Sequence, residues 1–91
     1  MTKNQALLNA RDEYLKLNAA YWKAFHADLW GRVEDLELDL LDAGEAMADA
    51  YLEHIRPLAT DEQFAIIERI KWEEKFWSKI SAPGFMERTA A

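Results

Sequence analysis

The sequence predicts an all-α protein in which a long antiparallel helical hairpin receives a shorter third helix, as a three-helix bundle within a single domain of residues 1–91. Three observations predict this class. Hydrophobic residues make up 51% of the chain, which is too apolar for a disordered segment. Apolar residues recur at steps of three and four in three segments. Only two prolines and three glycines are present, so few turns are expected.

The first helix is predicted from about residue 4 to about residue 30. Its apolar positions fall at helical steps, and they are Leu7, Tyr14, Tyr21, Phe25 and Leu29. Gly31 is the only glycine in the first forty residues, which favours a C-terminal cap followed by a tight turn. The alternative is a bend within one very long helix.

The second helix is predicted from residue 33 to residue 55, ending before Pro57. One face carries large apolar residues, namely Leu36, Leu40, Met47, Tyr51 and Ile55. Asp42 and Glu45 have the spacing of a capping box, which would restart a helix at that point. The acidic residues continue through Asp42 without a change of phase, so one continuous helix is favoured.

The third helix is predicted from residue 61 to residue 80, because Thr60 and Gln63 have capping-box spacing and Pro83 follows its end. Residues 81–91 are predicted to form a loose tail. The apolar arc of this helix spans roughly 220°. Ile66, Ile70 and Trp77 form the line expected to face the core, which leaves Trp72 and Phe76 near its edge.

Two explanations fit so wide an apolar arc. The bundle and the tail could wrap Trp72 and Phe76, or these two aromatic side chains could form an interface with another protein or a second copy. The apolar side of the second helix is also wide. We therefore expect self-association into a homodimer or a higher oligomer, which would build a larger helical bundle.

Acidic side chains are concentrated in the middle of the chain. Residues 28–53 contain nine acids and one base, although the net charge of the whole chain is only -6. Five of the acids recur at helical steps, with Ala46 filling the one gap, and these five, the acidic row, are Asp35, Asp39, Asp42, Asp49 and Glu53. A solvated helix face is the simpler interpretation. A solvated face usually mixes both signs of charge, however, so the row is also a candidate surface for a basic partner.

Two polar residues, Arg11 and Asn18, project into the apolar arc of the first helix. We expect both to be buried and hydrogen-bonded across helices, where they specify the register of the helices or where Arg11 reaches an acid on the second helix of another copy. The alternative is a polar pocket in which Arg11 holds an anionic ligand while Tyr14 and Asn18 orient it.

Several kinds of site lack a signature in this sequence. It has no cysteine, its two histidines, His26 and His54, stand in no metal-binding frame, and it has no glycine-rich phosphate loop. No catalytic residue, cofactor or metal ligand is therefore predicted, and the chain is expected not to be an enzyme. The acidic middle argues against direct binding to nucleic acid. No apolar run is long enough for a membrane span and no signal peptide is evident, so a cytoplasmic protein is expected.

These observations favour a non-enzymatic protein-binding protein, an inhibitor or an adaptor that occupies a basic surface of its partner. The predicted partner-binding residues are the acidic row together with Trp72 and Phe76. A row of carboxylates can imitate nucleic-acid phosphates, so an inhibitor of a nucleic-acid-handling complex, of the kind that mobile elements carry, is one form of this function. The alternative is a self-assembling accessory or assembly subunit that docks permanently on a larger enzyme.

Overall fold

The computed structural model describes residues 3–82, and the regular secondary structure of this range is entirely helical. The helices are α1 (Lys3–His26), α2 (Trp30–Ile55), α3 (Asp61–Ile70) and α4 (Glu74–Ile80). The all-α class is therefore confirmed, whereas the predicted third helix is in fact two. None of the helices in the described range has an apolar stretch long enough to cross a membrane.

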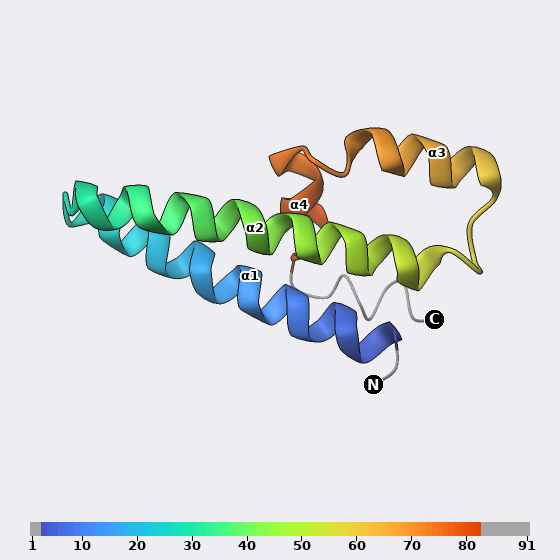
Figure 1. The fold of residues 1–91 in the computed structure, drawn as a ribbon, viewed down its shortest axis with the longest axis horizontal. Coiled ribbons are helices and arrows are strands. Elements are labelled where there is room, and N and C mark those ends of the chain that lie inside the picture. Colours follow the sequence, from blue (N-terminus) through green and yellow to red (C-terminus); the bar gives the residue numbers. More distant parts are fainter. Residues whose placement is uncertain (1–2, 83–91) are drawn as a thin grey trace.

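Helices α1 and α2 lie side by side and antiparallel, and they form the long axis of the molecule (Figure 1). The turn between them confirms the predicted hairpin, but Gly31 does not make it. Asp28 is the residue with a positive φ, 57°, and Leu29 N donates to Ala24 O at 3.0 Å. With the bond from Asp28 N to Phe25 O, this is a Schellman motif in which aspartate takes the usual place of glycine. Gly31 lies inside α2.

Helix α2 runs without interruption through Asp42 and Glu45, so the alternative of a second helix start at this point is wrong. Gly44 of this helix lies against the ring of Trp77. A Cβ atom at this position would lie 2.6 Å from Cε3 of Trp77. The glycine therefore allows the indole of α4 to rest directly on the α2 backbone.

The main core lies where α1, α2 and α4 meet. Its buried members come from all three helices, and they are Leu7, Tyr14, Ala43, Met47, Ala48, Phe76, Trp77 and Ile80. A smaller cluster near the hairpin turn consists of Ala24, Val33 and Leu36. Apolar burial of this kind is the main favourable contribution to the stability of a small domain.

The capping box predicted before α3 is confirmed. Gln63 N donates to Thr60 Oγ1 at 3.1 Å, and Thr60 N donates to Gln63 Oε1 at 3.0 Å. Helix α3 itself contributes no buried residue to the core. Of the predicted core line, Trp77 is buried, Ile70 is partly buried and Ile66 is exposed.

The prediction of one helix from 61 to 80 is wrong because the chain turns at residues 71–73. Trp77 Nε1 donates to Lys71 O at 2.7 Å, so an indole satisfies a carbonyl at the end of α3. After the turn, Phe76, Trp77 and Ile80 of α4 are all buried against the hairpin. The burial of these three large side chains favours the break over helical continuity.

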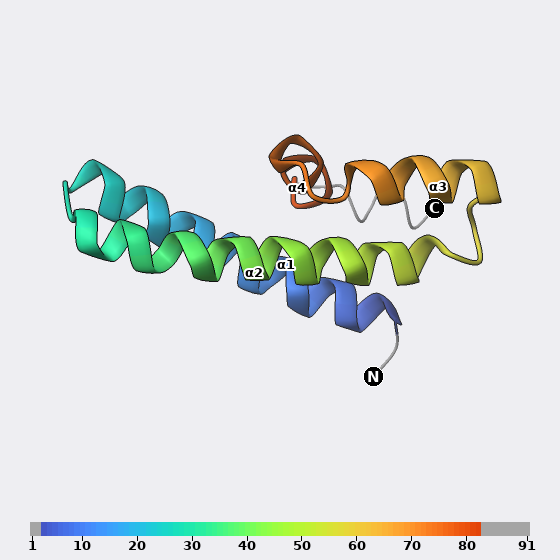
Figure 2. The same cartoon turned by 45° about the horizontal axis from the view of Figure 1, so that its top comes forward.

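Helices α3 and α4 cover only part of the hairpin. Figures 1 and 2 show both of them on one side of α2, over the half of the hairpin that lies away from the α1–α2 turn. The half that contains the turn has no covering helix in the described range. Side chains of that half are therefore candidates for contact with another molecule.

Candidate functional site

All five members of the acidic row are exposed. They lie on the side of α2 opposite to Gly44, and therefore opposite to the packed Trp77 ring. Within residues 3–82 only Asp49 of the row forms an ion pair, with Lys71 Nζ 3.5 Å from Asp49 Oδ1. The other four carboxylates are available to a partner.

The two predicted aromatic contact residues are separated. Trp72 is 52% exposed, whereas Phe76 is 8% exposed and packs edge-on against Tyr51, with ring centroids 5.6 Å apart. The turn at residues 71–73 is the physical reason, because it directs α4 into the core. Lys71 links Trp72 to the acidic row, since its Nζ lies 4.9 Å from the Trp72 ring centroid as well as beside Asp49.

Arg11 and Asn18 are only partly buried, so the prediction that both are buried is wrong. Arg11 does form hydrogen bonds outside its own helix, and their acceptors are backbone carbonyls. Its Nη2 donates to Ala82 O at 2.7 Å and to Ser81 O at 3.5 Å, just beyond the end of α4. The guanidinium thus satisfies two carbonyls that directly follow α4 and ties the end of this helix to α1. Ser81, predicted to lie in the loose tail, is buried there, and residues 83–91 of that tail lie outside the described residues.

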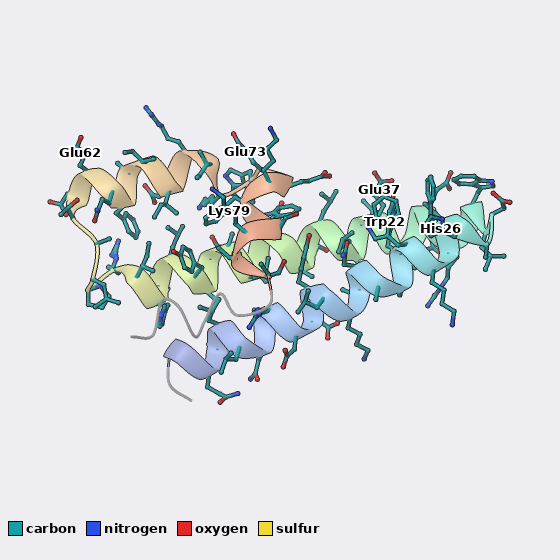
Figure 3. The ribbon with its side chains drawn as sticks, turned by 180° about the vertical axis from the view of Figure 1, so that it is seen from behind. Trp22, His26, Glu37, Glu62, Glu73 and Lys79 are labelled. Carbon is teal, nitrogen blue, oxygen red and sulfur yellow. The ribbon has the colours of Figure 1, made fainter. Side chains whose placement is uncertain are left out.

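A cleft of about 550 Å³ lies where α1, α2 and α4 meet, and its lining includes Tyr14 and Asn18 of the alternative polar pocket but not Arg11. All three helices contribute polar lining groups, and these include Tyr14, Asn18, Glu37, Glu74 and Ser78. Trp22 and Trp77 add aromatic rings to its wall. Figure 3 shows Trp22 of α1 and Glu37 of α2 close together on the same side of the hairpin.

Tyr14 is a deeply buried polar group of this cleft, at 6% exposure. Burial raises the pKa of its hydroxyl above the ordinary value, and the nearby carboxylate of Glu74 raises it further. The ring makes an edge contact with Trp77, with centroids 6.2 Å apart. The Tyr14 hydroxyl makes no hydrogen bond with any other residue in 3–82.

A feature that sequence reasoning missed is a group of exposed side chains near the hairpin turn. These hairpin-end aromatics are Trp22, Phe25 and Trp30. Phe25 contacts both neighbours edge-on, with its ring centroid 5.4 Å from that of Trp22 and 5.3 Å from that of Trp30. The spacing of Trp22 and Phe25 is visible in the sequence, but the periodicity alone suggested that Phe25 belongs to the core.

Comparisons of the chain with protein-family models, with curated proteins and with solved structures found no match. Among the described side chains, no group of three or more His, Asp or Glu residues is arranged to hold a metal ion. The proposals below therefore depend on the geometry of the chain itself.

Proposed function

We propose that this chain is a non-enzymatic cytoplasmic protein that binds another protein, as an inhibitor or adaptor, by placing the acidic row of α2 on a basic surface of its partner. The single observation that supports this function is the exposure of all five carboxylates along one side of a continuous helix. Like charges along one helix repel each other, and a basic partner would relieve that repulsion. The same field would accelerate encounter with such a partner.

Trp72 supplies an apolar contact beside this charged surface. It is exposed, and Lys71 connects it to Asp49 of the row. Tryptophan is frequent among the residues that dominate binding energy at protein interfaces. Phe76 is left out of the proposed surface because it is buried under Tyr51.

The form of this function that we favour is imitation of nucleic acid. From Asp35 to Glu53 the row extends along roughly 27 Å of helix axis, at ~1.5 Å per residue. The carboxylates of the row lie in a line along one helix, so they could occupy the positions that phosphates normally take in a basic groove. The proposed partner is thus a component of a nucleic-acid-handling complex, and a mobile element is a plausible carrier of such an inhibitor.

Charge reversal separates this function from simple solvation of α2. The double variant Asp39→Lys with Asp42→Lys should lower affinity for a partner captured from native lysate by about tenfold or more, because attractive contacts become repulsive. The matched control makes the same charge change on α1, at the exposed Asp12 and Glu13, and should bind like the wild type. Circular dichroism verifies helicity in both variants.

Salt provides the second arm of the same experiment. Wild-type affinity should fall steeply between 50 and 300 mM salt, on the order of tenfold, because exposed charges are screened. Equal affinity of the wild type and the α2 variant at both salt concentrations would refute recognition through the acidic row. The row would then serve solubility alone.

The second candidate function is a self-assembling accessory subunit, and the hairpin-end aromatics favour it. Trp22 and Trp30 are both about half exposed, and they lie on the two helices that flank the hairpin turn. Large exposed aromatic side chains that contact each other are typical of an interface. A second copy, or a larger enzyme, could cover them.

Self-association is therefore expected in light scattering at micromolar concentration, with a mass of a dimer or larger. Trp30→Glu should give the monomer, because it places a charge within the apolar interface. Trp72→Glu alters an equally exposed tryptophan distant from the hairpin turn and should leave the mass unchanged. A monomeric wild type, or the same mass for both variants, would contradict this assembly mode.

A further inference from the structure

The cleft between α1, α2 and α4 has a negative and aromatic lining. Glu37 and Glu74 supply two carboxylates, Trp22 and Trp77 supply indole rings, and none of the described residues that line it is basic. Arg11 of α1 lies outside this lining and is engaged with the carbonyls of Ser81 and Ala82. Within residues 3–82, neither Glu37 nor Glu74 forms an ion pair.

A buried polar group in the cleft also lacks a partner. Tyr14 is more than nine-tenths buried, lines the cleft and forms no hydrogen bond within the described chain. Its hydroxyl oxygen is not enclosed by the described chain, so the hydroxyl opens into the cleft, where a ligand or solvent can supply the partner. Asn18 and Ser78 add further hydrogen-bonding groups to the same wall.

We propose that this cleft binds a guanidinium group carried on an apolar stem, as in an arginine side chain. A guanidinium offers five N–H donors, which suits two carboxylates and the oxygens of Tyr14 and Asn18. Its planar face stacks on indole rings, and its methylene stem packs against the apolar part of the wall. An anionic ligand would be repelled by Glu37 and Glu74.

This site is independent of the acidic row. Glu37 lies on the side of α2 that adjoins α4, whereas the row lies on the opposite side of that helix. The two surfaces could therefore be occupied at the same time. A substitution that abolishes binding at the cleft should leave binding at the acidic row intact, and the reverse should also hold.

The test uses the four indole N–H signals of the ¹⁵N-labelled protein in two-dimensional NMR. N-acetyl-L-arginine amide is titrated into the full chain at low salt, and N-acetyl-L-citrulline amide, a similar but uncharged molecule, is the matched control. The arginine derivative should produce saturable shifts of the Trp22 and Trp77 signals, with a Kd in the millimolar range. Trp72, which is exposed outside the cleft, should not shift.

Three variants test the assignment of residues. Glu37→Gln combined with Glu74→Gln should weaken binding at least about tenfold, because both charged acceptors are lost. Tyr14→Phe should weaken it by a few fold while the ring keeps its edge contact with Trp77. The control is Glu34→Gln, an exposed acid on α2 outside the cleft, which should change affinity by less than about twofold.

A tripeptide with arginine at its centre distinguishes the source of the ligand. Affinity well above that of the single amino-acid derivative indicates a segment of a partner protein, whereas equal affinity indicates a free small molecule, and both results support the site. The proposal is overturned if citrulline amide shifts the same signals equally, if Trp72 responds as strongly as Trp22 and Trp77, or if the double glutamine variant binds as the wild type does. None of these outcomes bears on the acidic row, whose charge-reversed variant should bind the arginine derivative normally.

Discussion

Replacing Gly44 by alanine is expected to lower the free energy of unfolding by about 2 kcal/mol, although alanine favours helices over glycine by about 1 kcal/mol. The new methyl group would lie 2.6 Å from Cε3 of Trp77 and 2.7 Å from Cδ2 and Cζ3. The indole cannot readily retreat, because it is buried and its Nε1 is bonded to Lys71 O. Overpacking therefore outweighs the gain in helix propensity.

Gly31→Ala is the matched control for this prediction. Both glycines lie within α2, but a Cβ atom at position 31 would meet nothing within 4 Å. This substitution should be neutral or should stabilise the protein by up to about 1 kcal/mol. Urea unfolding followed by far-ultraviolet circular dichroism gives both free energies. If the two alanine variants were equally stable, the close packing of Trp77 on α2 would be disproved.

Replacing Ile80 by alanine is expected to lower the free energy of unfolding by about 2 to 4 kcal/mol. Ile80 is 2% exposed and lies in the main core with Phe76 and Trp77. Removing its larger side chain leaves a cavity among residues that are held from three helices. The loss therefore includes both the transfer energy of the deleted groups and the contacts of their neighbours.

Ile66→Ala makes the same chemical change on α3, where the side chain is 49% exposed. It should lower the free energy of unfolding by less than about 1 kcal/mol. The sequence pattern placed Ile66 and Trp77 on one core-facing line, so this pair of isoleucines also tests the break at residues 71–73. If Ile66→Ala lowered the free energy of unfolding more than Ile80→Ala, the prediction of one continuous helix from 61 to 80 would be supported instead.

Local signals in the sequence identified some helix boundaries, but α1 ends at His26 and not near residue 30, and α2 begins at Trp30 and not near residue 33. The capping box at Thr60 and Gln63 and the end of α2 before Pro57 depend on nearby residues, and both were predicted. The turn between α1 and α2 was predicted as well, but with the wrong residue, because aspartate occupies the left-handed position less often than glycine does. The break after Ile70 was not predicted, since tertiary burial of α4 causes it.

The candidate surfaces also differ in whether the sequence alone could predict them. Exposure of the acidic row follows from one helix and its period, so the sequence was sufficient to predict it. The cleft combines side chains such as Asn18, Glu37 and Ser78, which come from three helices. Periodicity shows which residues share a face of one helix, but it does not show which face another helix meets. For the same reason, sequence reasoning grouped Phe76 with Trp72 and overlooked the hairpin-end aromatics.

Helix α3 has no buried residue, and its main structural role is to connect α4 to the hairpin. Helix α4 has seven residues, far fewer than an isolated helix needs in water, so it is stable only while it is docked. Helix α3 contributes no buried residue, yet it fixes the distance over which α4 returns to the hairpin. Its regular backbone limits the volume that an undocked α4 can explore, which keeps the effective concentration of α4 at its docking site high. Rebinding of α4 is thereby favoured by the covalent geometry of α3, independently of any contact that α3 makes.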